Sequence, residues 1–581
     1  MKTTCLRRAT ALRALSGAAF AGSLFALMPG IAQAQVIERN PAPAPQPPAP
    51  LAKPDIAPDS AADATPLGMN LASIVVGEGA SIAPAAPGEV TLQLDRAMPK
   101  LQQTLRGYLN QPLSLKLIAA IKADIARAWR NAGYPFVHIT APEQDLSEGR
   151  LVLRVAEFRL GEARVEGTSE AEARRITRSV RQKAGEAIDF NGLAEDLEWL
   201  NRYPFRRVEA VFAPGKAAGD SDVTYRVKDV TPISMGDGYA NSGSPRTGQG
   251  RYFINALAGL PGTDVWGSYQ LTTSGQRWFD LGDGPAGSRR YLSHAARVSL
   301  PIASRTAVEL NFGDIRSSQP IQAFASRQHT REWSLTARTA LSNIAASLPG
   351  EISLGIDWKQ QRSRLTFGAA DVLRNAYDVG QVELGYGWHG YDARGETAVD
   401  LMLHASPGGL NDKNSDRGFR VASQGAFGNA QYLYATGSVY RRTAFGRISL
   451  VQAFDWQFAG TALPQTEQRG LGGRGQVRAY TLDDGAFDRS AILRNEVRFA
   501  GTPIGKGATA VQWTPSLFVE GGYAGQAGGK TSKLIGAAGA GLDLSLGNHL
   551  SLSADGAFAL RDQGDTKAGD LRGNVRVTAR F

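Results

Sequence analysis

Charged side chains occupy every second position from residue 494 to residue 498. Arg494, Glu496 and Arg498 fall on one face of an extended chain, where guanidinium and carboxylate groups can form ion pairs. The other face carries Ala491, Leu493, Asn495, Val497 and Phe499. A period of two with charges on one face predicts a strand between an apolar medium and a polar interior.

A glycine-rich loop, residues 471 to 488, precedes this strand. It contains the tetrad Val477, Arg478, Ala479 and Tyr480, in which one arginine lies among apolar neighbours. An arginine in this setting, beside a strand whose charges face inward, predicts a long loop that folds into a lumen.

The sequence contains no set of residues with the spacing of a catalytic or metal site. Asp483, Asp484 and Asp488 lack the spacing of an EF-hand loop, and we expect them in a solvated loop. Residues 472 to 475 are not followed by the Lys-Ser/Thr of a phosphate-binding loop. The histidines form no His-Glu-x-x-His motif, and there is no Gly-x-Ser-x-Gly elbow. We therefore expect no enzymatic activity, no cofactor and no metal.

Residues 231 to 581 alternate repeatedly and show little helical periodicity. The alternating segments include residues 265 to 272, 333 to 338, 352 to 359, 382 to 388 and 448 to 458. Their apolar positions often end in Trp, Tyr or Phe, as the aromatic girdles of a membrane barrel require. At roughly 10 residues per strand and a similar allowance per connection, this region would hold some 16 to 18 antiparallel strands.

The chain ends on another alternating segment. Val575, Val577, Ala579 and Phe581 share one face. A last strand that closes against the first would remove both exposed edges of the sheet.

The N-terminus has the pattern of a secretory leader. Four basic residues and an apolar run precede Ala32-Gln33-Ala34, which predicts a signal peptide over residues 1 to 34. The single cysteine, Cys5, lies in this leader, so the mature chain would contain no disulfide. The net charge of +10 falls to about +6 without the leader, which does not call for a nucleic-acid partner.

Residues 35 to 66 are rich in proline and alanine and predict a linker with extended conformations. We expect no helix here, and an extended segment in the pore remains open as an alternative.

Two small α/β domains follow, predicted over residues 67 to 157 and 158 to 230. In the first, Ser114 can cap a helix whose apolar face contains Ile118, Ile121 and Ile125. The second combines strands near residues 160 and 225 with two helices. One face of each sheet would be covered by helices, and open strand edges could bind an unfolded polypeptide.

The tetrad at 477 to 480, followed by the charged strand, resembles the TpsB family, the outer-membrane transporters of two-partner secretion (haemolysin-activator and filamentous-haemagglutinin transporter type). Residues 132 to 155 and 200 to 215 are similar to the two POTRA modules of that family, and residues 241 to 266 to its first hairpins. The resemblance selects 16 strands. The predicted fold is a membrane β-barrel of about 16 antiparallel strands, residues 231 to 581, preceded by two small α/β POTRA domains.

The resemblance also implies a site. In the family the tetrad arginine pairs with an acid of a Phe-x-Asp-x-Gly strand, and Phe518, Glu520 and Gly522 occupy those places here. Arg478 is therefore expected to pair with Glu520. Alanine at 479 replaces the glycine of the family tetrad. Phe581 corresponds to the terminal aromatic residue read by the outer-membrane assembly machinery.

The function implied is export of a secreted TpsA-type exoprotein through a pore in the outer-membrane lipid bilayer, with the POTRA domains in the periplasm. The alternative is a factor that assembles or inserts other outer-membrane proteins, although such factors carry more modules of this type. A diffusion porin and a secreted enzyme fit the two soluble modules and the missing catalytic set less well.

Overall fold

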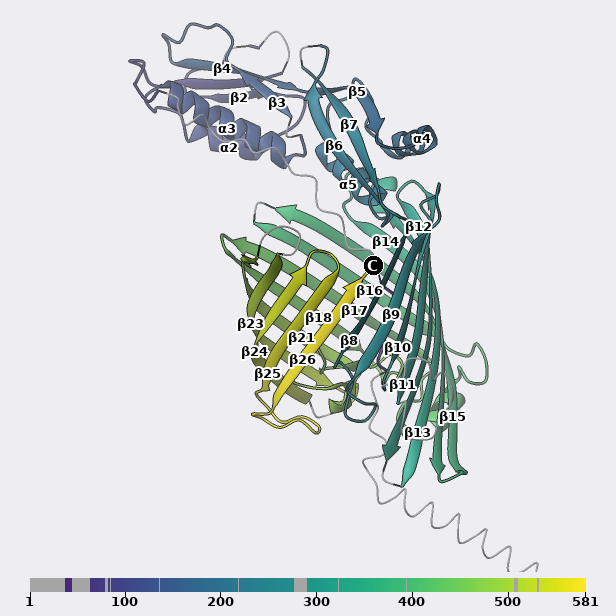
Figure 1. Cartoon of the computed structure of the whole chain (residues 1–581). Helices are drawn as coiled ribbons and strands as arrows, with labels where there is room; N and C mark the ends of the chain where they lie inside the picture. The colour runs from purple at the N-terminus through teal and green to yellow at the C-terminus, as the bar shows by residue number, and fades with distance from the viewer. Residues whose placement is uncertain are drawn as a thin grey trace, which may run out of the picture. The chain divides into compact units, whose positions relative to one another are not determined.

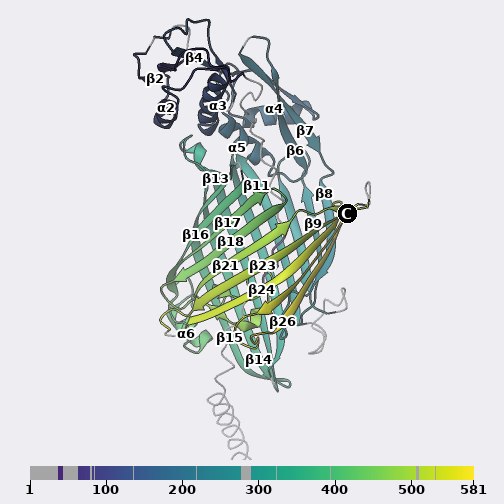
Figure 2. The same cartoon turned by 90° about the vertical axis from the view of Figure 1, so that its left-hand side faces the viewer.

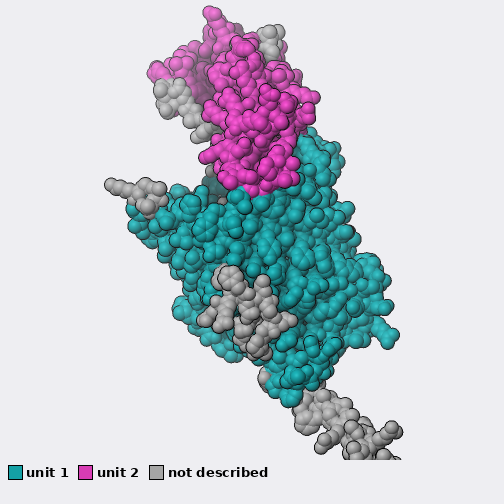
Figure 3. All heavy atoms as spheres, turned by 45° about the vertical axis from the view of Figure 1, so that its right-hand side comes forward, with its two compact units in different colours: residues 1–44, 233–258, 265–581 teal, residues 45–232, 259–264 magenta. Residues whose placement is uncertain are grey.

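The protein is described here by a computed structural model. The described residues are 37–43, 63–78, 82–83, 85–134, 136–217, 219–275, 290–321, 323–392, 394–505, 510–529 and 532–581. The predicted signal peptide lies outside them. The chain forms two compact units, coloured teal and magenta in Figure 3. Unit 1 contains residues 1–44, 233–258 and 265–581, and unit 2 contains residues 45–232 and 259–264.

Unit 1 is a closed barrel of sixteen long antiparallel strands, within the described ranges. The strands run obliquely around it in Figures 1 and 2. They are β8 (Ile233–Ala240), β9 (Arg251–Gly259), β10 (Trp266–Thr273), β11 (Tyr291–Ala303), β12 (Thr306–Ile321), β13 (Phe324–Ala340), β14 (Glu351–Phe367), β15 (Ala370–Asp392), β16 (Gly395–Pro407), β17 (Gln431–Phe445), β18 (Ile448–Ala459), β21 (Arg489–Phe499), β23 (Val511–Gly525), β24 (Ser532–Leu546), β25 (Leu550–Ala559) and β26 (Leu571–Arg580).

The barrel closes where the last strand meets the first. β26 pairs antiparallel with β8, with Arg580 opposite Gly236 and Arg576 opposite Ala240. The amide of Phe581 also donates to the carbonyl of Met235 at 2.8 Å. The closed sheet therefore leaves neither of these two strands with a free edge, as the C-terminal alternation predicted.

Side-chain alternation explains which residues face the inside. On β14, Leu354 and Ile356 are exposed on the outer surface, whereas Ser353 and Asp357 are buried. The inner face is polar and the outer face apolar, which suits a barrel in lipid. The predicted fold class, a barrel of about 16 strands preceded by small α/β domains, is confirmed.

The first α/β module of unit 2 has a four-stranded sheet in the order β2-β1-β4-β3. Its elements are β1 (Ser73–Gly77), β2 (Val90–Gln93), α2 (Pro99–Arg106), α3 (Leu115–Asn131), β3 (Val137–Thr140) and β4 (Arg150–Glu157). Ser114 caps α3 by accepting from the amide of Leu117. Ile121, Ile125 and Trp129 of α3 are fully buried against the sheet core. The sequence prediction did not include β1 or α2.

The second module has a three-stranded sheet in the order β5-β7-β6. It consists of β5 (Arg159–Glu166), α4 (Glu170–Ser179), α5 (Phe190–Leu200), β6 (Arg206–Pro214) and β7 (Asp220–Asp229). Ser169 and Asp189 cap the two helices. Ile176, Leu193 and Leu197 from these helices are buried with Val208, Val223 and Tyr225 from the sheet.

A fully buried arginine lies within unit 2. Arg206 donates from Nη1 to Glu172 at 2.9 Å and to Asp264 at 2.7 Å, and from Nη2 to the carbonyl of Leu200 at 2.7 Å. Burial alone would raise the pKa of the Glu172 carboxyl, but the hydrogen bonds from Arg206 and Thr168 outweigh it and lower that pKa. We call Arg206, Glu172 and Asp264 the Arg206 cluster.

The remaining elements are short. They are η1 (Leu341–Asn343), α6 (Asp416–Ser423), β19 (Arg469–Gly470), η2 (Leu482–Asp484), β20 (Ala486–Phe487) and β22 (Pro503–Ile504). Phe419 of α6 is fully buried in an apolar cluster that includes Tyr377 and Tyr432 from the barrel wall. Among the described residues, no helix combines the length and the apolar character needed to cross a membrane.

Candidate functional site

The loop from Gly460 to Asp488, between β18 and β21, folds back on the inner wall of the barrel. β19 pairs with β20 across the loop, and Thr481 and Asp484 form a capping box around η2. Val477, Ala479 and Tyr480 at the loop tip are buried with Ile492, Phe518 and Ile535 of the wall. These contacts place the loop tip against the inner side of β21, β23 and β24.

The structure brings Arg478 and Glu520 together. Arg478 Nε donates to Glu520 Oε1 at 2.7 Å, and the Arg478 backbone amide donates to Glu520 Oε2 at 2.8 Å. Both oxygens of one carboxylate thus bind the same loop residue, through its side chain and its backbone. The guanidinium also lies over the Phe518 ring, with Cζ 3.6 Å from the ring centroid.

A second carboxylate completes the arrangement. Arg478 Nη2 donates to Glu496 Oε2 at 2.5 Å, and Arg498 Nε donates to Glu496 Oε1 at 2.6 Å. Arg494 lies elsewhere on the same face of β21 and donates to Asp455 at 2.9 Å. Arg478, Glu496 and Glu520 form what we call the Arg478 clamp, which joins the loop tip to β21 and β23.

Small residues let the loop approach the wall closely. A Cβ atom on Gly522 would lie 3.2 Å from both Val477 Cγ2 and Ile535 Cγ1, so a side chain there would press on the loop tip. The Tyr480 hydroxyl donates to the carbonyl of Arg561 at 2.7 Å. Ala479 does not belong to the described non-glycine residues with positive φ, so alanine replaces the family glycine without left-handed strain.

The prediction of a solvated loop for Asp483, Asp484 and Asp488 is wrong, because all three side chains are buried. Asp484 accepts from the Thr481 amide at 2.6 Å and from the Thr566 hydroxyl at 3.0 Å. Asp488 accepts the amides of Leu463 and Ala527, each at 2.9 Å. The reason is local: backbone amides of neighbouring loops take the place of water as donors.

The polar network continues along the loop to Glu467, which the sequence analysis did not identify. Lys359 Nζ lies 2.9 Å from both carboxylate oxygens of Glu467, and the Tyr434 hydroxyl donates to Oε2 at 2.7 Å. Lys359 also pairs with Asp357 at 2.7 Å. The alternation on residues 352 to 359 did place Asp357 and Lys359 on the inner face, but no spacing in the loop indicates their partner.

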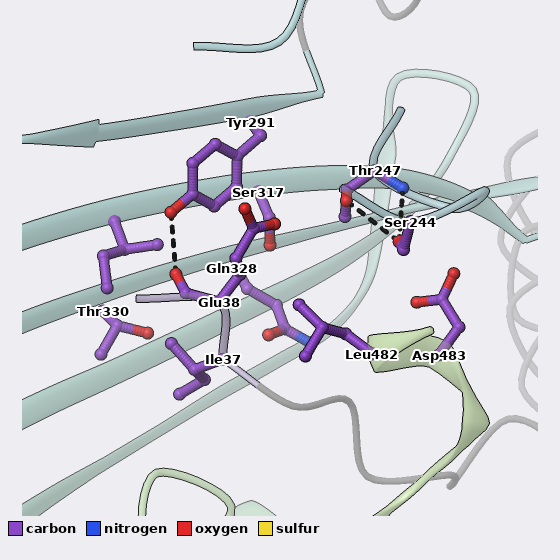
Figure 4. Close-up of a pocket in the computed structure, with 11 residues that line it drawn as sticks. Ile37, Glu38, Ser244, Thr247, Tyr291, Ser317, Gln328, Thr330, Leu482 and Asp483 are labelled. Atoms are coloured by element: carbon purple, nitrogen blue, oxygen red, sulfur yellow. Dashed lines mark hydrogen bonds between the residues drawn. The ribbon is translucent and has the colours of Figure 1, made fainter. Parts of the chain in front are cut away.

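The described part of the proline-rich region, Ile37–Pro43, belongs to unit 1 and contains no helix or strand. Glu38 pairs with Arg251 of β9, and Arg39 pairs with Glu332 of β13. Figure 4 shows Glu38 beside Tyr291 at a small pocket that Leu482 and Asp483 of the loop also line. Of the alternatives left open for this region, an extended segment in the lumen agrees with these contacts.

No group of three or more His, Cys, Asp and Glu side chains is placed to hold a metal ion within the described residues. Phe581, the residue after β26, is 80% exposed. The arrangement inside the barrel thus consists of ion pairs and hydrogen bonds that hold a loop and a segment against a wall.

Comparison with known proteins identifies relatives for both parts of the chain. Residues 219–546 match the family model described as haemolysin secretion/activation protein ShlB/FhaC/HecB, and residues 90–157 match a POTRA domain of ShlB type. The outer membrane transporter CdiB of Dickeya dadantii (strain 3937) is 24% identical over 405 residues, which cover 68% of each chain. CdiB-2 of Burkholderia pseudomallei (strain 1026b) is 27% identical over 164 residues, 28% of each chain.

Solved structures show the same fold. CdiB from Escherichia coli superposes with a TM-score of 0.64 at 20% identity, covering 91% of this chain and 94% of that one. CdiB from Acinetobacter baumannii gives a TM-score of 0.55 at 14% identity, covering 99% and 98%. Because the family model spans more than half of the sequence, this chain belongs to the ShlB/FhaC/HecB family of haemolysin secretion/activation proteins, the TpsB family.

Proposed function

We propose that this protein is an outer-membrane transporter of two-partner secretion, which moves a TpsA-type exoprotein from the periplasm to the cell surface. The observation that carries this proposal is a closed barrel whose lumen contains a long loop held by the Arg478 clamp, in a chain of the ShlB/FhaC/HecB family. The related CdiB proteins are named outer membrane transporters. We assign the barrel to the outer membrane and the α/β modules to the periplasm.

The POTRA modules supply the means of recognising an unfolded chain. In the first module β2 and β3 are the outer strands of the sheet, and in the second module β5 and β6 are. An extended segment of the exoprotein can add to such an edge through backbone hydrogen bonds that do not depend on its sequence. Recognition of this kind keeps the exoprotein extended, which a pore requires.

The loop governs access to the lumen. For a polypeptide to pass, the loop must stay against the wall, and the contacts of Arg478 with Glu520 and Glu496 hold it there. Hydrogen bonds to charged groups contribute about 1.5–3 kcal/mol each, so they can hold a resting position and still exchange with other partners. Folding of the exoprotein outside the cell supplies the driving force.

Two further assignments belong to the same proposal. The signal peptide ends at Ala34, the linker at about residue 66, and the POTRA domains at about residues 157 and 230. The strand that ends in Phe581 is the segment that the outer-membrane assembly machinery binds, and its exposed terminal side chain is accessible for that contact.

The test is an export assay with Arg478→Ala in cells that produce this chain and its exoprotein. We expect the exoprotein in the medium to fall roughly tenfold or more, because one or more charge-assisted hydrogen bonds are lost, while barrel abundance stays unchanged. Arg498→Ala is the matched control, since Arg498 contacts Glu496 but is not part of the loop. Normal export by Arg478→Ala at normal abundance would refute the anchoring role. Loss of other outer-membrane barrels on deletion of this chain, with export intact, would favour the assembly factor instead.

A further inference from the structure

Residues Ile37 to Asn40 contact the barrel wall as a bound peptide would contact its receptor. Each of these four residues contacts the inner wall or the lumenal loop: Ile37 lies in an apolar socket, Glu38 meets a guanidinium, Arg39 meets a carboxylate, and Asn40 donates to a tyrosine hydroxyl. The segment has no internal helix or strand that would hold this conformation. Its position is therefore set by the wall and the loop.

The acidic side chain occupies a receptor built around Arg251. Arg251 is 1% exposed, and its Nε and Nη2 donate to the two oxygens of Glu38 at 2.8 and 2.5 Å. The same guanidinium donates to the carbonyls of Gly248 and Gly250 and to the Thr247 hydroxyl. These contacts hold the arginine from the wall side and point its free fork at the carboxylate.

An aromatic ring supports the same receptor. Arg251 Cζ lies 4.4 Å from the centroid of the Tyr291 ring. The Tyr291 hydroxyl donates to the Glu38 carbonyl at 2.8 Å (Figure 4), and Asn40 Nδ2 donates to that hydroxyl at 2.9 Å. Tyr291 therefore binds both the backbone of the segment, at Glu38, and the side-chain amide of Asn40.

The basic side chain has a receptor of opposite charge. Arg39 Nε lies 2.9 Å from Glu332 Oε2, and Nη2 donates to Glu332 Oε1 at 2.6 Å and to the Thr466 carbonyl at 2.7 Å. Glu332 comes from β13, on the far side of β10 to β12 from Arg251. The order of charges along the peptide is thus matched by the order of charges along the wall.

The apolar residue fixes the direction of the segment. Ile37 packs with Tyr291 and Ile315, both buried. A cavity of about 20 Å³ beside it, lined by Ser244, Thr247 and Thr330 among others, has room for about one water molecule.

We propose that the inner wall of the barrel is a peptide-binding site selective for an extended apolar-acidic-basic-amide sequence, and that residues 37–40 are its ligand. If the segment leaves, the buried Arg251 loses the carboxylate that neutralises it, which is costly in a water-poor site. The vacated site therefore binds the same sequence supplied as a free peptide. This goes beyond export, and its test measures binding, so it can fail while the transport proposal stands.

The test uses the full-length chain with Glu38→Ala and Arg39→Ala, purified in detergent, and a fluorescent peptide Ile-Glu-Arg-Asn-Pro-Ala-Pro. We expect saturable binding by fluorescence anisotropy that the unmodified chain, whose site is filled, does not show. The matched control is the peptide Ile-Arg-Glu-Asn-Pro-Ala-Pro, which has the same composition with the two charges exchanged. It should bind roughly tenfold to a hundredfold more weakly, because both receptors then face like charges.

A second variant tests one receptor charge directly, and heat-modifiable migration on a gel shows that each variant is folded. Glu332→Gln added to the emptied chain removes one receptor charge at a side chain that is 17% exposed, and it should weaken the first peptide about tenfold while leaving the charge-exchanged peptide no weaker than before. Equal binding of the two peptides, or no saturable binding by a variant that still shows the heat-modifiable migration of a folded barrel, would overturn the proposal.

Discussion

The Arg478 clamp and the Arg206 cluster use the same chemistry for different ends. In each, one arginine contacts two carboxylates, but Arg478 extends from a loop, whereas Arg206 is the first residue of β6. The Arg206 side chain is fully buried, and that of Arg478 is 13% exposed. The difference teaches that burial of the arginine, together with the element that carries it, decides whether an ion pair stabilises a fold or anchors a movable loop.

The largest expected effect concerns the Arg206 cluster. Arg206→Ala leaves Glu172 and Asp264 without their shared cation and should destabilise unit 2 by about 3–5 kcal/mol. Hydrogen exchange of α4 and β6 amides in the full-length chain measures this loss. Arg206→Lys keeps the charge without the planar fork and should recover part of the protection. Unchanged hydrogen exchange of these amides in Arg206→Ala would show that the Arg206 cluster does not stabilise the fold, and the proposed difference from the Arg478 clamp would be wrong.

The next effect separates the charge of the Glu520 side chain from its length in the Arg478 clamp. Glu520→Gln removes the charge that Arg478 contacts through both its side chain and its amide, and we expect the anchoring of the loop to weaken by about 1.5–3 kcal/mol. Glu520→Asp keeps the charge and restores the acid usual in the family, so export should stay near normal. Accessibility of a cysteine placed at Gln476 to a maleimide reagent reports loop release. Equal labelling of both variants would argue that charge is not what holds the loop.

A smaller effect is expected from packing alone. Gly522→Ala places a Cβ atom 3.2 Å from Val477 and from Ile535, and overpacking of this kind costs about 1–3 kcal/mol when neighbours cannot move. Because the loop can move and the wall cannot, the change should increase labelling at Gln476 with the barrel intact. Gly521→Ala is the control, since the nearest atom to its Cβ position is at 3.9 Å.

The smallest effect is a pH dependence confined to unit 2. The pKa of Glu172 is lowered in the folded chain, so the unfolded chain binds more protons as the pH falls below the ordinary value of 4.5. The stability that Glu172 contributes is therefore present above that pH and is lost as the pH falls through the lowered pKa. Unfolding of the chain in acid, with and without Glu172→Gln, measures this contribution. Below pH 4.5 the stability of the Glu172→Gln variant should fall less steeply with decreasing pH than that of the unmodified chain. The same dependence of stability on pH in both chains would contradict the prediction.

The sequence predicted the features that depend on the alternation of side chains along a strand. It did not predict the contacts that form only when the barrel closes. Alternation in residues 352 to 359 was enough to place Leu354 outside and Asp357 inside, because strand geometry determines the faces. The partnership of Arg478 and Glu520 came from a resemblance and not from spacing. The pairs Glu38–Arg251 and Lys359–Glu467 could not be predicted, because residues 213 and 108 positions apart meet only when the barrel closes. The three buried aspartates were missed since polar loops are exposed by default.

The pairing of β26 with β8 also sets the order of events in biogenesis. The Val575 amide donates to Asn241, 334 residues earlier, so this contact cannot form until translation and export of the whole polypeptide are complete. Before β26 pairs with β8, each of these strands has an unpaired edge, and the interior of the sheet is open between them. The loop that contains Arg478 and the segment at Ile37 can enter the interior from the side, between the unpaired β8 and β26. Once β26 pairs with β8, both are enclosed, and they can then leave only along the barrel axis.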